Sequence, residues 1–171
     1  MTSFSDRVSS PVPFNLFVKF PMRLSSECSP PQVGRAVLLS VKPRYSELIL
    51  AGSKQVEFRR VWATEPVQWI AVYSSSPTQQ IVGIVEVESV VVGSASALWQ
   101  LNGMRGGGLT RAELRSYFAG KHEGYAVNLG RVLIPPSPIV PTRIVPAFRA
   151  PQSFRYLTEP EIDRLSRSFK P

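Results

Sequence analysis

The strongest structural signal in this sequence is a β-strand pattern from Ile81 to Val92, in which β-branched residues predominate. Gly83 lies inside this pattern, where a glycine is typical of a β-bulge. Shorter strand patterns, bounded by proline, glycine or serine, cover residues 36–41, 56–61, 67–73 and 124–134. Because these strands are short and outnumber the expected helices, the sequence predicts an α+β fold, a small mixed β-barrel with peripheral helices.

Helix signals lie between the strands and after them. Pro43 is typical of a first helical residue, and apolar residues then recur at helical spacing until Gly52, a candidate C-terminal cap. Further N-cap residues predict helices that begin after Ser94, Thr110 and Thr158. The glycine-rich residues 102–108 are expected to form a flexible loop, and residues 144–148 a last edge strand.

The distribution of proline divides the chain into three parts. Residues 1–34 contain several Ser-Pro and Pro-Pro pairs and no sustained period, so we expect an irregular, flexible N-terminal extension. Residues 35–150 carry the strand and helix patterns of the barrel domain. Residues 151–171 are expected to form a C-terminal extension with a short helix.

Composition excludes several kinds of site. Cys28 is the only cysteine and His122 the only histidine, so an internal disulfide is impossible and a zinc site or a Ser-His-Asp triad is disfavoured. We expect no metal and no cofactor. No apolar run approaches the ~18 residues needed to span a membrane, and no signal peptide is evident, which predicts a cytoplasmic protein without a membrane partner. The net charge of +8 favours an anionic partner, above all nucleic acid, although it can also serve solubility alone.

A dense group of charges follows the first expected helix. Lys54, Glu57 and Arg59 lie within six residues, at the start of an expected strand. Since side chains two apart on a strand point to the same face, Glu57 and Arg59 are expected side by side, with Val56 and Phe58 facing a core. Lys54 is expected at the turn into this strand.

This cluster has two interpretations. In the first, it lines a nucleotide pocket: Arg59 gives bidentate donors to a phosphate or base edge, Lys54 a point charge, and Glu57 an acceptor for an exocyclic amine. In the second, it is an ion-pair network that fixes the turn. Lys42, Ser74 and Ser75 are further candidate ligand-binding residues, since they end neighbouring strands, but a solvated strand end and ordinary turn chemistry explain them equally well.

Aromatic residues offer two further candidates. Tyr73 is expected either to stack on a base or to lie in the core. Residues 154–156 interleave two aromatic side chains with an arginine, as stacking surfaces do, although packing of the C-terminal segment on the barrel is the simpler account. The three tryptophans are expected in the core.

The segment from Gly52 to Arg59 matches the GxKxxExR signature of the ASCH domain, in the PUA-like superfamily. Residues 39–43, 73–77, 81–83 and 124–127 resemble the family's flanking segments in the same order, and the resemblance covers roughly 37–148. It implies a PUA-like barrel with a cleft lined by the signature, and members that act on RNA or modified nucleosides. One branch resembles RNA-binding or coactivator-like domains, another contains acetylcytidine amidohydrolases, and a few members are ribonucleases. In the amidohydrolases a threonine nucleophile matches the position of Glu57.

Three functions are therefore open. The first is a module, with a possible regulatory role, that binds RNA or a modified nucleoside or nucleotide through the Lys/Glu/Arg cleft. The second is a small nucleoside amidohydrolase or ribonuclease with Lys54 and Glu57 as the catalytic groups, because general acid–base catalysis needs two titratable groups in one pocket. The third is a protein-interaction or transcription-cofactor module in which the cleft is idle.

Overall fold

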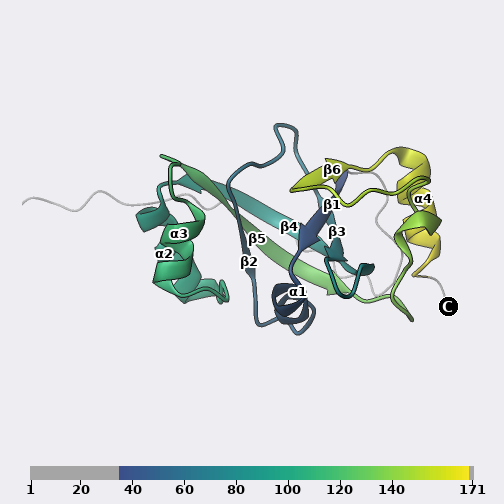
Figure 1. Cartoon of the computed structure of the whole chain (residues 1–171), viewed down its shortest axis with the longest axis horizontal. Helices are drawn as coiled ribbons and strands as arrows, with labels where there is room; N and C mark the ends of the chain where they lie inside the picture. Colours follow the sequence, from purple (N-terminus) through teal and green to yellow (C-terminus); the bar gives the residue numbers. More distant parts are fainter. Residues whose placement is uncertain (1–34, 170–171) are drawn as a thin grey trace, which may run out of the picture.

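The computed structural model describes residues 35–169, so the expected N-terminal extension, 1–34, lies outside the described residues. A mixed six-stranded sheet of order β2-β5-β4-β3-β1-β6 forms the centre of the molecule. Its strands are β1 (Ala36–Val41), β2 (Val56–Arg59), β3 (Trp69–Ser74), β4 (Gln80–Gly93), β5 (Gly124–Leu133) and β6 (Phe154–Tyr156). Only the β1–β3 pair is parallel among the described strands, and the sheet curls into a half-barrel (Figure 1).

Four α-helices surround this sheet, namely α1 (Pro43–Leu50), α2 (Ala95–Arg105), α3 (Arg111–Tyr117) and α4 (Glu159–Arg167). Figure 1 shows α2 and α3 at one end of the sheet and α4 at the other. The predicted α+β class with a barrel-like core is confirmed. Within residues 35–169, no helix has the length and apolar character needed to cross a bilayer.

Strands β1 and β3 are buried on both faces, and their side chains alternate between two apolar clusters. On β1, Ala36 and Leu38 enter a cluster closed by α4 and the segment that follows β5, whereas Val37, Leu39 and Val41 enter a second cluster beneath α1. This period of two is the expected geometry of an extended strand. The sheet therefore has two apolar faces, and a polar group on it must lie at an edge or in a pocket.

Strand β2 has a different environment from the central strands. Val56 and Phe58 enter a third cluster beneath α2 and α3, where Leu98, Leu114 and Phe118 contact them. The alternation then turns the intervening charged side chains of β2 to the opposite face, as the sequence predicts. Burial of Val56 and Phe58 thus fixes the direction of the signature's carboxylate and guanidinium.

The C-terminal segment is part of the same sheet. Strand β6 pairs antiparallel with β1, and the short helix expected there is α4, which buries Leu165 in the core. Arg155 of β6 donates to both carboxylate oxygens of Glu161, and Glu161 also completes a capping box with Thr158. Phe154 packs on Trp62 with ring centroids 5.6 Å apart, so residues 154–156 follow the packing account and not the stacking one.

Two local predictions are wrong. Residues 144–148 form no strand; a 3₁₀ turn at Pro141–Arg143 precedes them, and Pro146 lacks the amide donor that pairing requires. Helix α2 continues to Arg105, four residues into the expected glycine loop, and ends at Gly106, whose φ of 59° suits a glycine cap. Tyr73 is a core residue, 4% exposed, with its ring 5.0 Å from that of Phe148.

Candidate functional site

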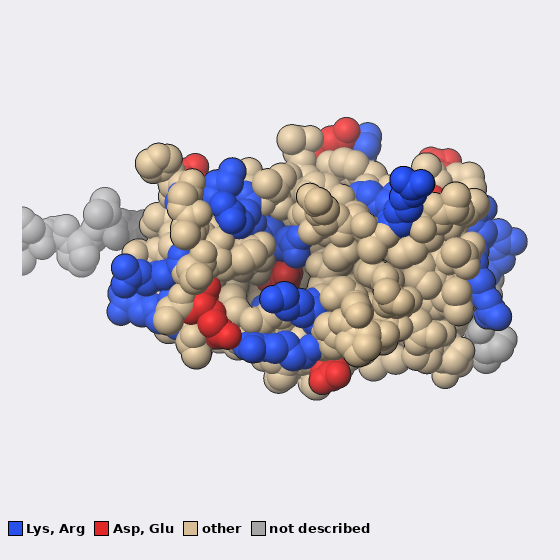
Figure 2. Space-filling model, viewed as in Figure 1, with Lys and Arg blue, Asp and Glu red and all other residues tan. Residues whose placement is uncertain are grey.

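A pocket of about 740 Å³ opens where the carboxyl end of β1 meets strand β2. Helices α1 and α3 and the residues before β6 complete its wall. Figure 2 shows the hollow in this face, with an acidic group at its floor and lysine and arginine groups around it. Its lining residues are Ser40, Val41, Lys42, Arg44, Tyr45, Lys54, Glu57, Phe58, Arg59, Ser75, Leu109, Glu113, Ser116, Tyr117, Ala150, Pro151 and Gln152.

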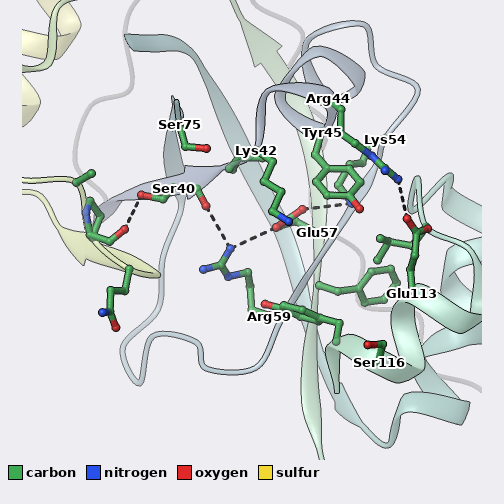
Figure 3. A pocket seen from close by; sticks show the side chains of 17 residues that line it. Ser40, Lys42, Arg44, Tyr45, Lys54, Glu57, Arg59, Ser75, Glu113 and Ser116 are labelled. Carbon is green, nitrogen blue, oxygen red and sulfur yellow. Dashed lines mark hydrogen bonds and ion pairs between the residues drawn. The ribbon is translucent and has the colours of Figure 1, made fainter. Parts of the chain in front are cut away.

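Five of the six predicted site residues meet at this pocket. Lys42, Lys54, Glu57, Arg59 and Ser75 all line it, and Figure 3 shows them converging from three segments of the chain. The sixth, Ser74, does not line it. Its side chain is buried, and its hydroxyl accepts a hydrogen bond from that of Ser46, 3.0 Å away.

Lys54 is the most buried charge in the pocket, with 2% of the side chain exposed. Its Nζ donates to the carbonyl oxygens of Val56, at 2.7 Å, and of Gly107, at 2.5 Å, and lies 3.2 Å from Glu57 Oε2. An ammonium has three N–H donors, so these three acceptors use all of them. In this arrangement Lys54 links strand β2 to the glycine run at 106–108, and its ammonium has no N–H donor left for a ligand.

The glycine run at 106–108 is held against this lysine. A Cβ on Gly107 would lie 2.1 Å from Asn102 Oδ1 and 2.7 Å from the ring of Phe58, closer than atoms can approach. Only glycine therefore lets the backbone come near enough for its carbonyl to reach Lys54. This explains a glycine run that carries no phosphate-loop motif: it packs against the signature strand and does not serve as a free linker.

Glu57 and Arg59 lie side by side on the pocket floor, as their spacing predicts. Arg59 Nη1 is 3.5 Å from Glu57 Oε1 and 3.4 Å from the Ser40 carbonyl oxygen, and its Nη2 donates to Ser153 Oγ at 2.7 Å. Arg59 Nε is buried and has no hydrogen-bond partner among the described residues. A buried N–H donor without an acceptor destabilises the fold, unless a bound molecule supplies the acceptor.

The rim of the pocket carries cations of two kinds. Arg44 is engaged, since its Nη2 lies 3.0 Å from Glu113 Oε1 and its guanidinium covers the Tyr45 ring at 4.6 Å. Lys42 is exposed and makes no ion pair within residues 35–169. Lys42 is therefore the rim cation that is available to an anion at the pocket mouth.

Tyr45 supplies a neutral hydroxyl to the pocket. Burial raises the pKa of its phenol; Arg44 acts in the opposite direction, and the carboxylates of Glu113 and Glu57 raise the pKa further. Its ring also packs on Lys54, with Nζ 5.4 Å from the centroid. At neutral pH this side chain is therefore a hydrogen-bond donor and an apolar wall, and not an anion.

Several lining residues were not predicted from the sequence. The sequence indicates Tyr45 only as part of the helical apolar pattern that follows Pro43, and it gives no site candidate on α3. Residues 150–152 and the partner of Arg59, Ser153, lie at and beyond the predicted end of the barrel domain. No local signal identifies them, because β6 brings this segment to the pocket only by pairing with β1. Residues 35–169 contain no group of three His, Cys, Asp or Glu side chains placed to hold a metal ion.

Comparison with known proteins agrees with this geometry. No protein-family model matches the chain. A curated relative from Zymomonas mobilis named "ASCH domain-containing ribonuclease" is 29% identical over 140 residues, which cover 77% of this chain and 90% of the relative. The crystal structure of ASCH from Zymomonas mobilis superposes with a TM-score of 0.71 at 28% identity, covering 77% of this chain and 94% of that one.

Two variants of the same bacterial protein, one with a tyrosine replaced by phenylalanine and one with a serine replaced by alanine, superpose equally well. The curled mixed sheet agrees with this similarity in structure. In sequence and in fold, this chain is similar to the ASCH domain proteins.

Proposed function

We propose that this protein binds single-stranded RNA, with one nucleotide held in the pocket beside Glu57 and Arg59. The observation that carries the proposal is the Arg59 guanidinium in the pocket lining, whose Nε has no hydrogen-bond partner among the described residues. An arginine guanidinium matches phosphate and base edges through paired donors, and Nε with one Nη forms one such pair. The related protein named as a ribonuclease supports RNA as the class of ligand.

The size and charge of the pocket fit a nucleotide. Pockets that hold small organic ligands typically measure about 300–1,000 Å³, and this one measures about 740 Å³. Four basic and two acidic side chains line it, a balance of +2. Lys42 at the rim is placed to pair with a phosphate, and the Ser75 hydroxyl lines the same mouth.

In this proposal Glu57 selects the base. The ammonium of Lys54 and the guanidinium of Arg59 each approach a different oxygen of its carboxylate. Each oxygen has a second lone pair that can accept from an exocyclic amine such as that of cytosine. A free modified nucleoside could use the same contacts without Lys42, so the contribution of Lys42 separates the two ligands.

A second candidate is RNA cleavage, favoured by the relative named as a ribonuclease, of which the match covers 90%. Glu57 would then serve as the general base, and Arg59 would stabilise charge that develops on the phosphate. Lys54, with its donors engaged, would position Glu57 and would not transfer a proton itself. This differs from the expectation that Lys54 and Glu57 are both catalytic groups.

The test is fluorescence anisotropy with a labelled single-stranded RNA over a range of salt concentrations. We expect binding to weaken as salt rises, with a shallower salt slope in Lys42→Gln by about 0.7, the value for one phosphate contact on a single strand. The matched control is Arg167→Gln, an exposed arginine of α4 at the opposite end of the sheet (Figure 1). Equal effects of the two variants would place binding outside the pocket.

The same RNA, separated on a gel after incubation, tests cleavage. We expect Glu57→Gln to lose its preference for the base and any cleavage that the wild type shows, while the cations of the pocket still hold the RNA. Binding without cleavage in the wild type would leave the binding module alone, and hydrolysis of an acylated nucleoside would instead favour the amidohydrolase function. A wild type that neither binds nor cleaves RNA would refute the proposal and favour the protein-interaction module.

A further inference from the structure

Helix α3 contributes one complete face to the pocket. Its lining residues Glu113, Ser116 and Tyr117 are spaced three and four apart, so they share one side of the helix. Glu113 is committed at the N-terminal end, where it accepts from the Thr110 amide and pairs with Arg44. At the C-terminal end of this face, the lining residue Tyr117 is open to solvent.

Tyr117 stands at this open end with 36% of its surface exposed. Its ring meets the ring of Phe118 edge-on at 5.2 Å, and Phe118 is itself buried at 3% exposure. The Tyr117 hydroxyl makes no hydrogen bond among residues 35–169. Phe118 therefore supports the Tyr117 ring on one side, while part of the ring remains accessible at the pocket edge.

Two cations lie at the turn that ends α3, close in sequence or by hydrogen bond to the residues that follow Tyr117. Arg60 follows Arg59 directly in the chain, and its Nη2 donates to the carbonyl oxygen of Ala119 at 3.2 Å, in the turn that ends α3. This bond uses one of five guanidinium donors, and the side chain is exposed. Lys121 is exposed in the same turn, with its backbone amide bonded to the Phe118 carbonyl.

The opposite wall of the pocket has a different character. Ala150, Pro151 and Gln152 line it without a charged or aromatic side chain. Single-stranded nucleic acids bind where an aromatic ring for stacking lies beside cations that pair with the backbone. Among the described residues that border the pocket, the end of α3 has this combination and residues 150–152 do not.

We infer that Tyr117, Arg60 and Lys121, here called the α3 rim, hold a second nucleotide of the same RNA strand. Its base stacks on the Tyr117 ring, and its phosphate pairs with Arg60. This inference rests on the proposed function and narrows its ligand to a strand of at least two nucleotides instead of a free nucleoside. Arg59 and Arg60, adjacent in the chain, then contact successive nucleotides from the pocket floor and from the rim.

The test compares a mononucleotide with a short RNA on the same variants. Binding of cytidine monophosphate is followed by NMR of ¹⁵N-labelled protein, and binding of a labelled single-stranded RNA decamer by anisotropy. Tyr117→Ala should weaken decamer binding by about 5- to 150-fold, the range for one lost stacking contact, and Tyr117→Phe should restore it. Arg60→Gln should lower the salt slope for the decamer by about 0.7. Arg60→Gln should leave mononucleotide binding within about twofold. Tyr117→Ala, which also removes part of the pocket wall, should weaken binding of the decamer clearly more than binding of the mononucleotide, whereas Arg167→Gln should alter neither ligand.

Each outcome bears on the inference. Equal losses for the mononucleotide and the decamer in Tyr117→Ala would make Tyr117 a wall of the first site and would overturn the second one. No loss in either variant would overturn it as well. A wild type that binds the mononucleotide as tightly as the decamer would refute the α3 rim and leave the proposed function intact, whereas a wild type that binds neither would refute both. Thermal unfolding of each variant separates loss of binding from loss of fold.

Discussion

Replacement of Lys54 by methionine tests whether this lysine holds the fold together or contacts the ligand. Methionine keeps the unbranched chain that packs between the rings of Tyr45 and Phe58 but removes the ammonium. Two buried carbonyl oxygens then lose a donor, and Glu57 keeps only the 3.5 Å contact with Arg59.

The magnitude follows from burial. Breaking a buried ion pair by removal of one partner costs about 3–5 kcal/mol, because the remaining charge and carbonyls lose their partners and stay largely dry. Side-chain exposure of 2% for Lys54 and 10% for Glu57 places the pair in this class and not among weak surface pairs. In a domain of this size the loss corresponds to a fall in melting temperature of about 10–20 °C.

Urea unfolding measures this free energy directly, and a double-mutant cycle identifies its source. The combined variant Lys54→Met/Glu57→Gln should be less destabilised than the sum of the single changes by about 1–2 kcal/mol, because the second change removes the unpaired charge. A Lys54→Met protein within about 1 kcal/mol of the wild type that has lost RNA binding would refute this reasoning. Lys54 would then be a ligand contact whose donors change partners on binding.

Two further predictions concern packing and pH. Gly107→Ala should destabilise the protein by about 1–3 kcal/mol in urea unfolding, because the new Cβ would overlap Asn102 and Phe58, whereas the control Gly103→Ala has nothing within 4 Å and should stabilise α2 by up to about 1 kcal/mol. Burial by itself would raise the pKa of Glu161, but hydrogen bonds from Arg155 and Thr158 lower the pKa overall. A carboxyl group whose pKa is lowered by folding stabilises the fold at pH values above its pKa in the unfolded chain, near 4.3. This stabilisation is lost as pH falls through the lower pKa of the folded state. Glu161→Gln should therefore cost about 1–3 kcal/mol at pH 7 and progressively less below about pH 4. An equal cost at pH 7 and pH 3 would contradict this account.

The sequence predicts this fold wherever the determining interactions are local. Alternation of apolar side chains identifies β1 and β4, and the capping box of Thr110 and Glu113 identifies the start of α3, because each involves neighbours within four residues. The same local rule places Glu57 and Arg59 on one face. The sequence does not predict the edge strand β6, because the interaction that determines it is not local. Strand β6 has three residues and is defined by its pairing with β1, more than 100 residues earlier.

The site is predictable to the same extent. The signature identifies the charged side chains on the pocket floor, but the groups that accept their hydrogen bonds lie far away in the sequence. Gly107 is 53 residues from Lys54, and Ser153 is 94 residues from Arg59. Neither residue type attracts notice alone, since a serine in a loop and a glycine in a glycine run are ordinary turn residues. Only the folded sheet shows that they are the acceptors for the signature's cations.

These partners also determine where affinity for an anion should originate. Lys54 has three protein acceptors and Arg44 has Glu113, so a phosphate that recruits either one must break an existing pair. Lys42 has no carboxylate partner among the described residues, and Arg59 shares Glu57 at 3.5 Å while its Nε is unpartnered. Binding energy is largest where a cation gains a partner without losing one. Change at Lys42, which lies outside the signature, should therefore affect affinity with little cost in stability, whereas change at Lys54, inside the signature, should do the reverse.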